Sequence, residues 1–99
     1  MQAFYPFAFE REMGFTEQQL RSWLPEACGG REIGWGDRCA ELRLDGQRVT
    51  VEWQALPPRR IALLTLPRLA VRFDANGVQA HTWQRFMRHF DRVAQRGGG

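Results

Sequence analysis

The chain has 99 residues, of which 43% are apolar and 25% are charged, and this size and composition predict a single globular domain. No apolar run reaches the roughly 18 residues of a membrane span, and two cysteines are too few for a disulfide framework. The N-terminus lacks the basic and apolar regions of a signal peptide, so we expect a cytoplasmic protein with no membrane partner.

The net charge of +3 is unevenly distributed along the chain. Residues 1–56 hold 6 arginines and 9 acidic residues, which gives −3, whereas residues 57–99 hold 8 arginines and 2 acidic residues, which gives +6. All 14 basic residues are arginines, a bias typical of GC-rich coding sequences. The total charge is therefore a weaker indication of nucleic-acid binding than its distribution.

The first 30 residues predict an aromatic strand followed by a helix. Tyr5, Phe7 and Phe9 alternate with a proline, an alanine and a glutamate, which is typical of an edge strand with an aromatic inner face. Thr16 and Gln19 have the spacing of a capping box and mark the start of the helix. A proline near the end of this segment and two following glycines predict where the helix stops.

A glycine-rich loop at residues 29–37 leads into a predicted hairpin. Asp45-Gly46 is a two-residue turn signal, and it places Leu42 opposite Val49 on one apolar face. Trp35 lies in the loop between two glycines. It either closes the end of the core or serves as an anchor for a ligand or partner.

Residues 60–74 have strand character throughout, after a loop predicted at Pro57-Pro58. We expect one long strand, bent or broken at Pro67, because residues 65–68 lack the glycine or asparagine of a tight turn. One side of this strand is expected to face the core: Ile61, Leu63, Leu69, Val71 and Phe73. Ala62, Leu64 and Leu66 then face outward as an aliphatic patch, which predicts an interface unless the N-terminal segment or the Trp35 loop covers it.

A second helix is predicted from about residue 79 to residue 95. Its apolar residues cover an arc of about 120° and predict the buried side: Trp83, Phe86, Met87, Phe90, Val93 and Ala94. The opposite side carries a histidine and four arginines, namely His81, Arg85, Arg88, Arg92 and Arg96. This row is either an anion-binding surface or an ordinary solvated face.

Together these elements predict an α+β two-layer sandwich, with an antiparallel sheet and two helices on one of its faces. The expected order is strand, helix, hairpin, long strand, helix. Residues 1–96 are expected to form the domain and residues 97–99 a flexible glycine tail.

No established catalytic, metal or cofactor motif is present in the sequence, and we lean against an enzyme. Cys28, Cys39, His81 and His89 lack zinc-site spacing. Two hypotheses follow. The first is a protein-interaction module or homodimer joined through Ala62, Leu64 and Leu66, with Trp35 as a further candidate. The second is a weak polyanion binder whose acidic-protein or nucleic-acid partner meets the arginine row of the last helix.

Overall fold

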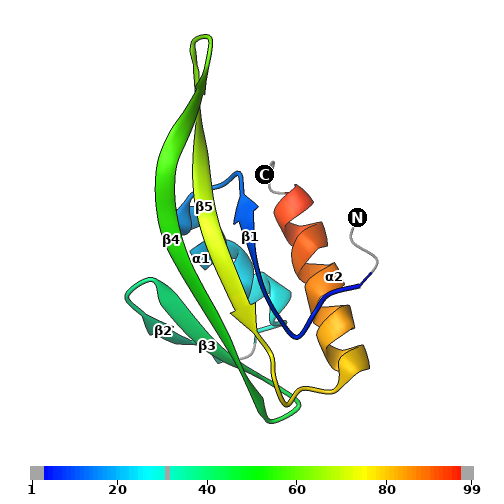
Figure 1. Cartoon of the computed structure of the whole chain (residues 1–99). Helices are drawn as coiled ribbons and strands as arrows, with labels where there is room; N and C mark the ends of the chain where they lie inside the picture. The colour runs from blue at the N-terminus through cyan, green and yellow to red at the C-terminus, as the bar shows by residue number, and fades with distance from the viewer. Residues whose placement is uncertain (1–3, 31, 97–99) are drawn as a thin grey trace.

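In the computed structural model, which describes residues 4–30 and 32–96, the chain forms a five-stranded antiparallel sheet and two helices (Figure 1). The elements are β1 (Ala8–Met13), α1 (Glu17–Ala27), β2 (Gly34–Gly36), β3 (Cys39–Leu44), β4 (Gln47–Ile61), β5 (Leu64–Asp74) and α2 (Ala80–Arg96). The strand order across the sheet is β1-β5-β4-β3-β2. Both helices lie on one face of the sheet, which confirms the predicted α+β two-layer sandwich. The glycine tail predicted at 97–99 lies outside the described residues.

Local signals place the start of α1 where the sequence predicts it. The Thr16 hydroxyl accepts a hydrogen bond from the Gln19 backbone N–H at 3.2 Å, and Gln19 Oε1 accepts from the Thr16 N–H at 2.8 Å. This is a complete capping box, so two backbone donors at the helix start are satisfied by side chains. The helix ends at Ala27, two residues after Pro25. Gly29 follows with a φ of +68°, a conformation that glycine adopts without steric cost.

The predicted hairpin is also confirmed. Asp45 and Gly46 have φ values of +51° and +80°, as the central residues of a type I′ turn require. Leu42 pairs with Val49, and both side chains are buried against the helices. Because one face of this hairpin is buried, a register shifted by one residue would expose these side chains.

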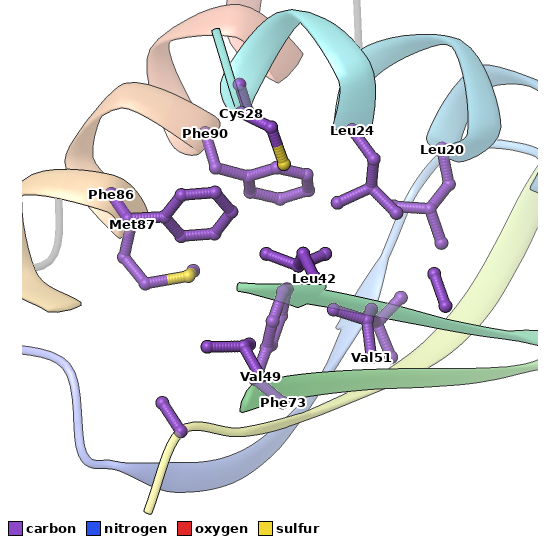
Figure 2. Close-up of a cluster of buried hydrophobic side chains, with 14 of the residues drawn as sticks. Leu20, Leu24, Cys28, Leu42, Val49, Val51, Phe73, Phe86, Met87 and Phe90 are labelled. Atoms are coloured by element: carbon purple, nitrogen blue, oxygen red, sulfur yellow. The ribbon is translucent and has the colours of Figure 1, made fainter. Parts of the chain in front are cut away.

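The core lies between the sheet and the two helices (Figure 2). The predicted inner face of α2 is buried: Trp83, Phe86, Met87, Phe90, Val93 and Ala94. Phe73 of β5 is at the centre of the aromatic packing, with its ring centroid 5.6 Å from that of Phe90 and 5.2 Å from that of Phe9. The aromatic inner face predicted for β1 is therefore confirmed at Phe9, and β1 is an edge strand as expected.

Polar contacts fasten the segment before β1 to α2. The Tyr5 backbone N–H donates to Gln84 Oε1 at 2.8 Å, and Gln84 Nε2 donates to the Tyr5 carbonyl at 2.7 Å. The Tyr5 hydroxyl donates to Asp91, which also forms an ion pair with Arg11. Burial, followed by the hydrogen bond to Asp91, raises the pKa of Tyr5 to about 12.

The long strand predicted for residues 60–74 is wrong, because the chain reverses within it. β4 continues to Ile61, a two-residue turn at Ala62-Leu63 follows, and β5 returns alongside β4. The turn uses Ala62 at a φ of +54°, a left-handed conformation that is uncommon for residues other than glycine and asparagine. Because the turn contains neither glycine nor asparagine, the usual residue signal of a tight turn is missing. The loop predicted at Pro57-Pro58 is wrong as well, since β4 passes through both prolines.

Candidate functional site

The outer part of the β4–β5 hairpin, residues 56–68, projects beyond the rest of the sheet and is called the arm below (Figure 1). β1 pairs with β5 only as far as Leu69, and β3 pairs with β4 only as far as Glu52. Within the described residues, the arm is thus a two-stranded ribbon with no strand beside it. It contributes to the longest dimension of the molecule, 45 Å.

Large aliphatic side chains are exposed at the end of the arm. The exposed fractions are 50% for Ile61, 101% for Leu63, 62% for Leu64 and 40% for Leu66. Ile61 pairs directly with Leu64, so these two side chains share one face of the ribbon. A cluster of exposed aliphatic residues on a small protein is typical of an interaction surface.

A β-bulge at the prolines sets which side chains meet on the arm. Pairing changes from Leu56 opposite Arg68 to Arg59 opposite Leu66, so two prolines of β4 oppose Pro67 alone. Prolines suit this position because they have no N–H to donate to a ladder. The extra residue inverts the alternation of β4, and this inversion brings the side chain of Ile61 to the same face as Leu64 and Leu66 of β5.

Arg68 fastens the base of the arm to the sheet. Its Nε and Nη2 donate to the two carboxylate oxygens of Glu12 on β1, at 3.1 Å and 2.8 Å. Its Nη1 donates to the carbonyl of Pro57 in the bulge, at 3.1 Å. The hydrogen bond from Arg68 lowers the pKa of Glu12 below its ordinary value. One guanidinium therefore links an edge strand, the bulge and β5.

Three of the four interface residues predicted from sequence lie on the arm, and the fourth, Trp35, does not. Leu64 and Leu66 are exposed on the arm, and Ala62 is exposed in its turn. Ile61 and Leu63 were expected in the core and are instead exposed, because the reversal at residues 62–63 carries them away from the helices. One signal for the reversal was present in the sequence: the prolines at positions 58 and 67 lie equally far from the centre of the turn.

Trp35 lies far from the arm, on the short edge strand β2. It pairs with Ala40, which is buried, so its side chain is on the helix side of the sheet. The Arg21 guanidinium of α1 lies 5.3 Å from the Trp35 ring centroid and 5.0 Å from that of Trp53. Glu17 accepts a hydrogen bond from Trp53 Nε1 at 2.8 Å, and this bond lowers the pKa of Glu17. Trp35, which is 42% exposed, thus packs over one end of the sandwich.

A groove of about 440 Å³ lies between α2, the end of α1 and the β3–β4 turn, and is called the arginine groove below. Three of the four predicted anion-binding arginines line it, namely Arg85, Arg88 and Arg92, together with His89. Its other walls come from Ala27, Cys28, Gly29, Leu44, Asp45, Thr82 and Phe86. The Thr82 hydroxyl donates to Asp45 at 2.8 Å and joins α2 to the β3–β4 turn.

Arg96, the fourth predicted anion-binding arginine, does not line this groove. It forms an ion pair with Glu26 of α1. Sequence spacing predicts all four arginines on one side of α2. Only the packing of α1 against α2 shows that Arg96 has an acidic partner and that, among the described residues, the other three do not.

Neither metal-binding clusters nor membrane-spanning helices are found in residues 4–30 and 32–96. No three histidine, cysteine, aspartate or glutamate side chains come together there in an arrangement that could hold a metal ion. Neither of the two helices there is both long and apolar enough to cross a membrane.

The chain matches no protein-family model, and no curated protein matches it. The geometry of the arm and of the arginine groove therefore carries the functional argument.

Proposed function

We propose that the protein is an interaction module that forms a homodimer through the arm. The observation that carries this proposal is the cluster of exposed aliphatic side chains at the end of the arm: Ile61, Leu63, Leu64 and Leu66. Removing such side chains from water is favourable by about 25 cal/mol per Å² of apolar surface. A contact that covers these side chains therefore stabilises the complex relative to the separate chains.

The size of the arm favours a second copy as the occupant. A stable interface uses about 20–30 residues from each partner. The arm has 13 residues in positions 56–68, so it is too small to form such an interface alone. A two-fold dimer provides enough interface residues, because each copy both contributes an arm and receives the arm of its partner.

Charge indicates where the arm of the partner would lie. The arm contains Arg59 and Arg60 and has no acidic residue. The sheet face away from the helices presents exposed carboxylates at Glu10 and Glu52, which flank Arg72 in the register. Arg59 and Arg60 are consecutive in β4 and point to opposite faces of the ribbon, so an arm lying across this face brings one of them towards these carboxylates, which favours one orientation over others.

The proposal includes a cytoplasmic location. Cys28 and Cys39 are thiols rather than a disulfide, as is usual in a reducing compartment.

Leu64→Arg tests the proposal, because it places a charge where the interface would be driest. We expect the wild type to have twice its chain mass of 11.5 kDa by light scattering at tens of micromolar. The Leu64→Arg variant should be a folded monomer, since burying an unpaired charge is strongly unfavourable. Gln18→Arg, which adds the same charge to an exposed position of α1, should remain a dimer.

A second variant removes the arm altogether. Leu56 and Arg68 are direct partners, so residues 57–67 can be replaced by Asn-Gly to close the hairpin with a two-residue turn. We expect this shortened chain to fold and to be monomeric. A monomeric wild type, or a shortened chain that still dimerises, would contradict the proposal.

A further inference from the structure

We infer that the arginine groove is a binding site for a compact organic oxyanion, a small apolar or aromatic molecule that carries a phosphate or carboxylate. This site is separate from the arm, because it lies among the helices and the β3–β4 turn. It does not depend on whether the chain dimerises.

The helical spacing of the basic residues directs them towards the groove. At 100° per residue, Arg85, His89 and Arg92 fall within an arc of about 60° on α2, and Arg88 lies about 40° further round. Arg85 and Arg92 are separated by about 10 Å along the helix axis, with His89 between them. Three guanidinium groups therefore line the α2 wall of the groove.

The groove arginines also have no acidic partner, a property they share with Arg38, Arg43, Arg59, Arg60 and Arg72 among the described residues. Ion pairs hold Arg11, Arg21, Arg48, Arg68 and Arg96. Among the described residues, Arg85, Arg88, Arg92 and His89 form no hydrogen bond or ion pair. Among the residues that the structure describes, Asp45 is the single carboxylate that lines the groove, and Thr82 already donates to it. The lining therefore has an excess of positive charge that an anion would neutralise.

The shape and floor of the groove favour a compact ligand over a long polyanion. Its volume of about 440 Å³ falls within the range of small-molecule sites, about 300–1,000 Å³. The end of α1 and the β3–β4 turn line it on the sides facing α2. Part of the lining is apolar, with Ala27 and Phe86 7% and 6% exposed, and a small ring or short chain can pack against it.

Phenyl phosphate is the probe we choose, since it combines a small ring with a phosphate dianion. In an NMR titration of the whole chain, we expect saturable shifts of backbone amides at residues 27–29, 44–45 and 82–92. Inorganic phosphate should produce the same shifts at about tenfold higher concentration, because it lacks the ring that contacts the apolar floor. Phenol, which lacks the charge, should produce no saturable shift.

The decisive variant is Arg85→Gln with Arg92→Gln. Both positions are exposed, so the fold should be retained, as an unchanged amide spectrum away from α2 would verify. We expect affinity for phenyl phosphate to fall at least about tenfold, the effect of losing charge-assisted hydrogen bonds. Arg43→Gln with Arg72→Gln removes the same charge from exposed positions on β3 and β5 and should change affinity less than about twofold.

Three results would overturn the inference. The first is the absence of saturation by phenyl phosphate at tens of millimolar. The second is equal weakening in both double variants, which would show a general charge effect rather than a site. The third is binding of a single-stranded oligonucleotide that requires Arg85 and Arg92 and is much tighter than binding of phenyl phosphate, which would indicate a polyanion surface.

Discussion

The sandwich and the arm contain similar aliphatic residues but use them in opposite ways. Leu42 and Leu69 are each 1% exposed within the sandwich, whereas Leu64 and Leu66 are 62% and 40% exposed on the arm. All four lie in strands of the same sheet. The difference arises because the helices cover only one face of the sheet, whereas Leu64 and Leu66 lie on the other face of β5 and in the arm, which extends past the helices. The exposure of a leucine in this chain therefore depends on the face and the part of the strand on which it lies, as Leu66 and Leu69 of the same strand β5 show.

The polar contacts of the two regions also differ in how far they are exposed to solvent. The segment before β1 is held to α2 by the buried Tyr5, whose hydroxyl reaches Asp91. The base of the arm is held by Arg68 and Glu12, whose side chains are 30% and 44% exposed. A buried hydrogen bond is expected to act on the stability of the sandwich, and an exposed ion pair mainly on the position of the arm.

The largest expected effect comes from removing the same side chain in the two regions. Leu42→Ala should lower the free energy of unfolding by about 2–5 kcal/mol, because it leaves a cavity in a closely packed core. Leu64→Ala should change it by less than about 0.5 kcal/mol, as is usual for exposed positions. Denaturant titration at a concentration where both variants are monomeric measures the difference. Equal losses from the two substitutions would show that the arm is part of the cooperative core.

The second prediction concerns the buried hydroxyl of Tyr5. This residue is the single tyrosine of the chain, so the ultraviolet absorbance of tyrosinate reports on it alone. We expect a pKa of about 12 instead of the ordinary 10.0. Because the native state holds this proton more tightly than the unfolded state, its contribution to stability is complete below pH 10 and is lost as the pH rises towards 12.

Asp91→Asn distinguishes the two main causes of the raised pKa of Tyr5, which are burial and the hydrogen bond to Asp91. Removing the carboxylate should bring the pKa of Tyr5 part of the way back towards 10.0. It should not restore it fully, because burial is the larger cause and remains. A tyrosine that titrates at its ordinary pKa in the wild type would mean that the hydroxyl is accessible to water and that this segment is not fastened to α2.

Much of the sandwich could be predicted because its signals are local. The capping box at Thr16 and Gln19 involves residues three apart, and the turn at Asp45-Gly46 involves two neighbours. The buried side of α2 follows from helical periodicity alone. In each case one short segment contains all the residues that predict the structure, and its packing in the folded chain favours the same conformation.

The arm and the arginine groove could be predicted only in part, because other segments complete them. The exposed leucines at 64 and 66 followed from alternation, but the exposure of Ile61 depends on a turn that lacks glycine and on a bulge that inverts β4. Similarly, the arginines of α2 followed from periodicity, whereas the facing wall of the groove comes from the end of α1 and from Asp45. Long-range packing of this kind has no signature in a single segment.

The smallest expected effect tests how the arm is fastened. The pKa of Glu12 lies below its ordinary value of 4.5, chiefly because Arg68 donates hydrogen bonds to it. The native state thus binds this proton less tightly than the unfolded state. The contribution of the pair is present above the ordinary pKa of glutamate and is lost as the pH falls through the lowered value.

Arg68→Gln should return the pKa of Glu12 to its ordinary range, as measured by carbon-detected NMR titration of the carboxyl groups. Glu17 is the matched control, because its pKa is lowered chiefly by the hydrogen bond from Trp53 and should not change in this variant. The same substitution removes the donor to the Pro57 carbonyl, so amide hydrogen exchange should quicken at residues 59–66 while the amides of α2 keep their protection. If Glu12 titrated identically in the variant and the wild type, Arg68 would not fasten the arm, and the bulge alone would set its direction.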